Sequence, residues 1–173
     1  MTSKLSISQI ILWIFVIWLG IEIGAGIYEA LVIVPLWASA APDSVIGFYQ
    51  HNTADPRFTM NAGLRFWIFA TPGVGLLSIA TLLTSFKTRP EHRKWRLTGA
   101  GLALIVVIST FAWFVPTLIK LTSGQVLTMN PNDIASLANW WVRLNWLRAG
   151  VYILGWIAAL RALTVPSKGT EIE

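Results

Sequence analysis

Four long stretches of the chain are almost entirely apolar: residues 7–37, 64–86, 97–121 and 138–163. An α-helix needs about 20 apolar residues to cross the hydrocarbon core of a bilayer, so each stretch is long enough to span it. The stretches lack the alternation of apolar and polar residues that marks barrel strands, and backbone groups in lipid must be bonded within their own segment. The pattern predicts an all-α membrane protein with one transmembrane domain, residues 1–173, folded as an up-down-up-down four-helix bundle.

The composition supports a membrane protein and narrows its chemistry. Hydrophobic residues make up 55% of the chain and charged residues only 12%, about half the share in soluble domains. The absence of cysteine excludes disulfides, thiolate metal sites and thiol-redox catalysis. No HExxH or paired-histidine pattern occurs, so the sequence predicts no metal site and indicates no cofactor.

The basic residues are concentrated in one connection. Segment 87–96 holds five of the thirteen Lys and Arg residues, whereas the connection at 38–63 carries Asp43, Asp55 and Arg57. The positive-inside rule therefore places both termini and the 87–96 loop in the cytoplasm and the 38–63 loop outside, as in a bacterial inner membrane. The net charge of +5 thus reflects topology. The expected partner is the lipid bilayer and not nucleic acid, because no folded aromatic surface accompanies the basic run.

Charged residues within the spans are costly and mark candidate sites. Glu22 and Glu29 are seven residues apart, so both lie on one face of the first helix. At about 1.5 Å per residue, Arg148 of the fourth span lies at a depth where it could meet either acid, which predicts a buried Glu–Arg pair. The alternative is an ion pair that only fixes helix register. Gly20 and Gly24 have the spacing that admits a neighbouring backbone.

Residues of the fourth span recur at intervals of three and four and form one polar-aromatic stripe: Trp141, Asn145, Arg148 and Tyr152. Prolines occur in or toward the external half of three spans, at Pro35, Pro72 and Pro116, and predict kinks that open a cavity near the outer surface. We expect Trp113 and Trp141 to line this cavity, and Trp37 and Trp140 to belong to an interfacial belt.

These patterns give two sets of candidate site residues. The catalytic candidates are Glu29, Glu22, Arg148 and Asn145, and the substrate-binding candidates are Trp141, Trp113, Tyr28, Tyr152 and His51. His51 lies in the external connection, where it could fold over the cavity mouth, and a plain surface position is the alternative. The connection itself could form a lid in the membrane interface.

Three segments together resemble the anthrone oxygenase-like family of small four-span membrane proteins: 28–37 (YEALVIVPLW), 114–121 (FVPTLIKL) and 141–148 (WVRLNWLR). The resemblance implies that Trp141, Asn145 and Arg148 match recurrent positions of that family's last span. Characterised members of the family oxidise polyketide anthrones to anthraquinones with dioxygen, and often have His where this chain has Asn145. Asn cannot act as a general base, so the base would be Glu22, Glu29 or His51.

The sequence leaves three hypotheses open. The first is a membrane oxygenase or oxidoreductase that acts on a small apolar or aromatic molecule in an outward-facing cavity. The second is a small-molecule or proton-coupled binding or transport protein, which with four spans and no inverted repeat would need to form a homo-oligomer. The third is a structural subunit whose buried polar groups only set helix packing.

Overall fold

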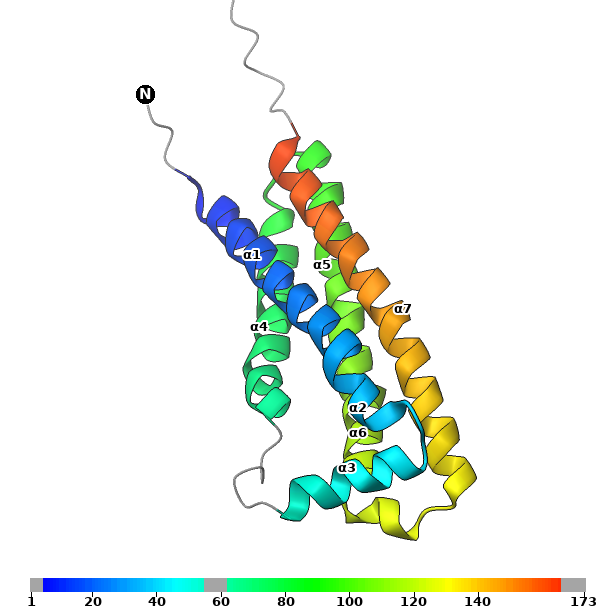
Figure 1. The fold of residues 1–173 in the computed structure, drawn as a ribbon. Helices are drawn as coiled ribbons and strands as arrows, with labels where there is room; N and C mark the ends of the chain where they lie inside the picture. Colours follow the sequence, from blue (N-terminus) through cyan, green and yellow to red (C-terminus); the bar gives the residue numbers. More distant parts are fainter. Residues whose placement is uncertain (1–4, 55–61, 166–173) are drawn as a thin grey trace, which may run out of the picture.

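The computed structural model describes residues 5–54 and 62–165. Every regular element in these ranges is helical, which confirms the all-α prediction. The described ranges contain four helices long and apolar enough to cross a membrane: Ile7–Ala38, Arg65–Ser85, Pro90–Thr122 and Pro131–Thr164. They form one elongated bundle, and the described chain begins and ends at the same end of it (Figure 1). These features are those of a multi-pass integral membrane protein.

The first span consists of α1 (Ile7–Tyr28), a π-helical turn η1 (Glu29–Ile33) and α2 (Val34–Ala38). Ser6 starts α1 with a capping box that it shares with Gln9. In η1 the Val34 N–H donates to the Glu29 carbonyl, one residue further back than in an α-helix. Pro35 follows at once and has no N–H to continue the regular ladder. The π-turn therefore accommodates the proline without ending the span.

The third span repeats this order with α5 (Pro90–Ser109), the π-turn η3 (Thr110–Phe114) and α6 (Val115–Thr122). The Val115 N–H donates to the Thr110 carbonyl, and Pro116 follows. The start of the span corrects the predicted cytoplasmic loop at 87–96. Pro90 is a favourable first helical residue, so only residues 86–89 form the connection, and the rest of that basic segment is helix.

The second and fourth spans are single helices, α4 (Ala62–Ser85) and α7 (Pro131–Thr164). Asn130 caps α7 through the Asn132 N–H, so this helix begins earlier than the predicted boundary at 138. The predicted external loop at 38–63 contains α3 (Asp43–Ala54), and the 3₁₀ turn η4 (Gly124–Thr128) lies beside it. Both elements cover the end of the bundle opposite the termini (Figure 1).

The backbones of α5 and α7 approach each other closely. A Cβ built on Gly99 would lie 2.9 Å from the Gly155 carbonyl oxygen, so only glycine fits there. The prediction that Gly20 and Gly24 admit a neighbouring backbone was wrong. Gly20 faces the ring of Trp156, and a Cβ at Gly24 would meet nothing within 4 Å.

Two apolar clusters fill the bundle. The first lies toward the termini and centres on α1, with Leu12, Phe15 and Leu19 fully buried. The second lies toward α3 and includes Trp37 and Trp141. Burial of Trp37 contradicts its predicted place in an interfacial belt, whereas Trp140 is exposed as expected.

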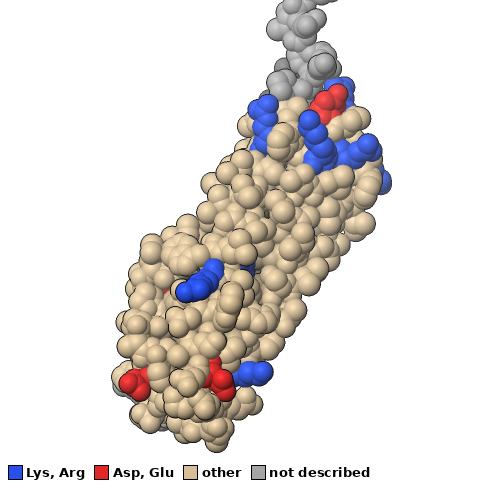
Figure 2. Space-filling model, turned by 90° about the vertical axis from the view of Figure 1, so that its right-hand side faces the viewer, with Lys and Arg blue, Asp and Glu red and all other residues tan. Residues whose placement is uncertain are grey.

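Charged residues are distributed unequally between the two ends. On the face shown in Figure 2, Lys and Arg gather with an acidic residue at the end where the described chain begins and ends, whereas acidic residues stand beside fewer basic ones toward the opposite end. The charge asymmetry inferred from the sequence is therefore present on the folded surface.

Candidate functional site

A cavity of about 260 Å³ lies between the first span, α4, the η3–α6 segment and α7. Its walls are mainly apolar, with aromatic rings from three of these elements. Eight polar or charged side chains also face it: Glu22, Glu29, Thr71, Thr110, Thr122, Asn145, Arg148 and Tyr152. Glu29 and Thr110 are the first residues of the two π-turns, so the cavity lies where both spans depart from regular α-helix.

Arg148 is held against one wall by hydrogen bonds to neutral groups. One terminal nitrogen donates to Asn145 Oδ1 at 2.6 Å and the other to Thr110 Oγ1 at 3.2 Å. The guanidinium carbon lies 4.4 Å from the centre of the Phe114 ring, a cation–π distance. Since a guanidinium has five N–H donors, this arrangement fixes Arg148 and leaves donors for a bound molecule.

The two acids occupy different surroundings. Glu22 is only 2% exposed, and its Oε1 accepts a hydrogen bond of 2.8 Å from Thr71. Its Oε2 and the Tyr152 hydroxyl are both buried and near each other, and neither atom meets the geometry of a hydrogen bond in the described chain. Glu29 is less buried and lies beside Trp67.

The predicted direct Glu–Arg ion pair is absent from the described part of the chain, where no carboxylate oxygen lies within 4.0 Å of Arg148. The physical reason is that Asn145 and Thr110 hold the guanidinium on one wall, while Thr71 holds Glu22 on another. The acids and Arg148 therefore face the same cavity from different walls, and no ion pair bridges it.

Aromatic packing supports the wall behind Arg148. The Trp141 indole N–H donates to the Phe114 carbonyl at 3.3 Å, and its ring meets Phe114 edge-on at 5.8 Å. Trp37 packs on the other side of Trp141 at 5.2 Å. Trp113 does not line the cavity and instead packs edge-on against Phe114 at 4.8 Å.

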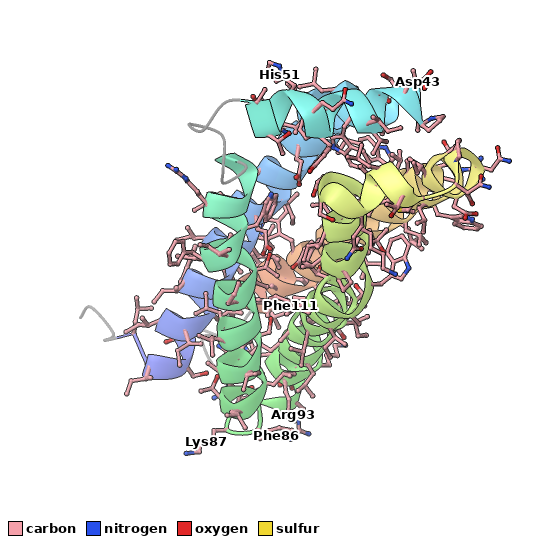
Figure 3. All side chains as sticks on the ribbon, turned by 90° about the horizontal axis from the view of Figure 1, so that it is seen from below. Asp43, His51, Phe86, Lys87, Arg93 and Phe111 are labelled. Atoms are coloured by element: carbon pink, nitrogen blue, oxygen red, sulfur yellow. The ribbon has the colours of Figure 1, made fainter. Side chains whose placement is uncertain are left out.

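The structure brings six of the nine predicted site residues together around the cavity: Glu22, Glu29, Trp141, Asn145, Arg148 and Tyr152. The other three lie outside it. Trp113 is in the supporting layer, Tyr28 is exposed on the surface of α1, and His51 is exposed on α3. Figure 3 shows α3 running from Asp43 to His51 across the bundle, and no residue of α3 lines the cavity.

Sequence reasoning missed several cavity residues: Trp67, Thr71, Thr110, Phe111 and Phe114. A signal for the third span was present, because Thr110 stands six residues before Pro116 just as Glu29 stands six before Pro35. Thr71 directly precedes the proline of α4. Positions before membrane prolines therefore mark the cavity level in addition to the charged residues within the spans.

The chain matches no protein-family model, no curated protein and no solved structure. The described residues contain no group of three His, Asp or Glu side chains placed to bind a metal ion. They do combine a fixed cation, two carboxyl groups and an apolar enclosure, a set suited to binding and deprotonating a small, weakly acidic molecule.

Proposed function

We propose that the protein is a membrane-embedded oxidoreductase, similar in chemistry to the anthrone oxygenase-like family, that oxidises a small aromatic molecule with dioxygen. The main support is that Arg148 and two carboxyl groups face one mainly apolar cavity and form no direct ion pair with each other. Buried polar groups without partners are costly, so they favour a ligand or water that completes them. The volume of about 260 Å³ lies just below the range of roughly 300–1,000 Å³ for drug-sized ligands, which suits one compact molecule.

In this proposal Glu29, as a carboxylate, removes a proton from a CH₂ group that is activated by a nearby carbonyl. Arg148 donates to the carbonyl oxygen as it gains negative charge, which stabilises the enolate. The enolate transfers electrons to dioxygen, a C–O bond forms at the deprotonated carbon, and the resulting hydroperoxide loses water. The balance is CH₂ plus O₂ giving C=O plus H₂O, so all the reducing electrons come from the substrate.

Glu29 is the better base of the two acids. Glu22 is almost fully buried and is already bonded to Thr71, whereas Glu29 is less buried and has the Trp67 indole as its neighbouring donor. Asn145 has no basic atom, and its role is to position Arg148 through the 2.6 Å hydrogen bond.

We also propose an orientation of the bundle in the membrane. The basic end of the bundle would face the cytoplasm of a bacterial inner membrane, which places the cavity in the outer half. The two π-turns and the proline that follows each of them lie in this half.

The test uses the full chain in lipid nanodiscs with anthrone as substrate, and follows oxygen uptake and quinone absorbance. We expect Arg148→Gln and Glu29→Gln each to lower kcat by about 10²–10³-fold, the loss typical of a removed oxyanion donor or base. Arg143→Gln and Glu91→Gln are matched controls, because both residues are exposed and lie outside the cavity. Both controls should retain full turnover.

Two outcomes would contradict the proposal. If wild-type protein binds anthrone saturably but consumes no oxygen, the cavity is a binding site and not an oxygenase site. If neither turnover nor binding is found, and the two cavity variants differ from wild type only in thermal stability, the polar groups are structural.

A further inference from the structure

One wall of the cavity lies between α4 and the η3–α6 segment, and few contacts cross it. Helix α4 packs extensively against α1 and α5 but has little contact with η3 and α6 in the described chain. Three residues that line the cavity along this seam are also exposed on the outer surface: Ile68 at 46%, Phe111 at 52% and Ile119 at 56%. Figure 3 shows Phe111 in the space between α4 and the helix that contains it.

All three residues belong to helices that qualify as membrane spans. Their exposed surfaces are apolar, as a surface that faces lipid requires. Phe111 and Ile119 are eight residues apart, and because the π-turn η3 adds one residue to this stretch, they lie on nearly the same face of the span. The boundary between α4 and the η3–α6 segment is thus lined by apolar side chains, and the cavity behind it contains polar ones.

We propose that Ile68, Phe111 and Ile119 form a lateral portal through which the substrate reaches the cavity from the lipid phase. The identity of the substrate rests on the proposed function, whereas the route does not. An apolar rim at this depth favours an uncharged, lipid-soluble aromatic molecule. Such a molecule becomes negatively charged only inside, where Arg148 can stabilise the charge.

The absence of cysteine in the chain permits a direct test of the route. Ala149 lines the cavity, so Ala149→Cys introduces a single thiol inside it. The variant is reconstituted into proteoliposomes and treated either with lipid-soluble pyrenylmaleimide or with a sulfonated, membrane-impermeant maleimide. We expect rapid labelling by the first reagent and none by the second.

Substitutions at the rim then locate the route. In the Ala149→Cys background, Ile68→Trp and Ile119→Trp should each slow pyrenylmaleimide labelling by about tenfold, and Phe111→Ala should accelerate it. Ile105→Trp is the matched control, because Ile105 is equally exposed to lipid on α5 but does not line the cavity. The control should label at the unsubstituted rate.

Labelling by the sulfonated reagent, or equal rates in rim and control variants, would overturn the portal. If a tryptophan variant misfolds, Phe111→Ala still tests the portal. An unchanged rate of pyrenylmaleimide labelling in that variant would contradict a route past the Phe111 ring. Labelling needs no turnover. Loss of oxygenase activity with lateral labelling intact would therefore reject the proposed function alone.

Discussion

The two halves of the bundle use the same four spans but pack them differently. Toward the termini, the helices are regular and close together, with Gly99 against Gly155 and Phe15 fully buried. Toward α3, two spans contain a π-turn before a proline, and a cavity of about 260 Å³ lies between them. The first is therefore a solid half, and the second is a hollow half in which the other apolar cluster packs around the cavity.

The difference shows how a small membrane protein can keep polar groups away from lipid. A π-turn adds one residue to a helical turn, which disturbs the side-chain ridges that would otherwise fill the space against neighbouring helices. The hollow half gains room for Glu29 and Thr110, which begin the two π-turns. The solid half fixes the positions of the helices, so that the hollow half does not collapse.

The largest effect on stability is expected from a cavity made in the solid half. Phe15→Ala should lower the free energy of unfolding by about 3 kcal/mol, the lower end of the usual range, because the unfolded side chain lies in detergent and not in water. Phe114→Ala should cost less, since one side of that ring already borders empty space. SDS titration followed by circular dichroism measures both, and equal losses would contradict a solid half and a hollow half.

The second-largest effect on stability is expected at the contact between α5 and α7, which lies in the solid half. Gly99→Val should destabilise the protein by about 1–3 kcal/mol, because the new side chain meets the backbone of α7. Gly101→Val is the matched control two residues away on the same helix, where a Cβ would meet nothing within 4 Å. Thermal unfolding in detergent should separate the two variants, and the idea fails if they unfold alike.

The spans and the charge asymmetry were predictable because the bilayer imposes strong rules. Length and apolarity locate the helices to within a few residues, apart from ends such as Pro90 and Pro131 that extend beyond the hydrocarbon-like run. Arg148, Glu22 and Glu29 stood out for the same reason, since a charge within a span is costly anywhere.

The details of the site were harder to predict because they depend on rotation about the helix axes. Sequence gave the depth of Glu22 and Arg148 but not which walls they occupy, so the direct ion pair was a wrong inference. Threonines give little signal, because a hydroxyl can bond its own helix, as Thr110 does to the Val106 carbonyl. A π-turn has no apolar pattern of its own, and only the following proline indicated one.

The smallest expected effect on stability comes from replacing one threonine by valine in each half. Thr71 donates to Glu22 at 2.8 Å in the hollow half, whereas the Thr81 hydroxyl is buried in the same helix without a partner among the described residues. Thr→Val keeps the shape and removes only the hydroxyl. Thr71→Val should therefore cost about 1 kcal/mol, because it leaves the buried carboxyl with one bond fewer.

Thr81→Val should be neutral or slightly stabilising, because it removes a polar atom that gains nothing from burial. SDS titration of the two variants beside wild type gives both values under one condition. A loss at position 81 as large as that at position 71 would mean that the Thr81 hydroxyl has a partner, such as bound water. The solid half would then contain bound water. Only the π-turns would still distinguish the two halves.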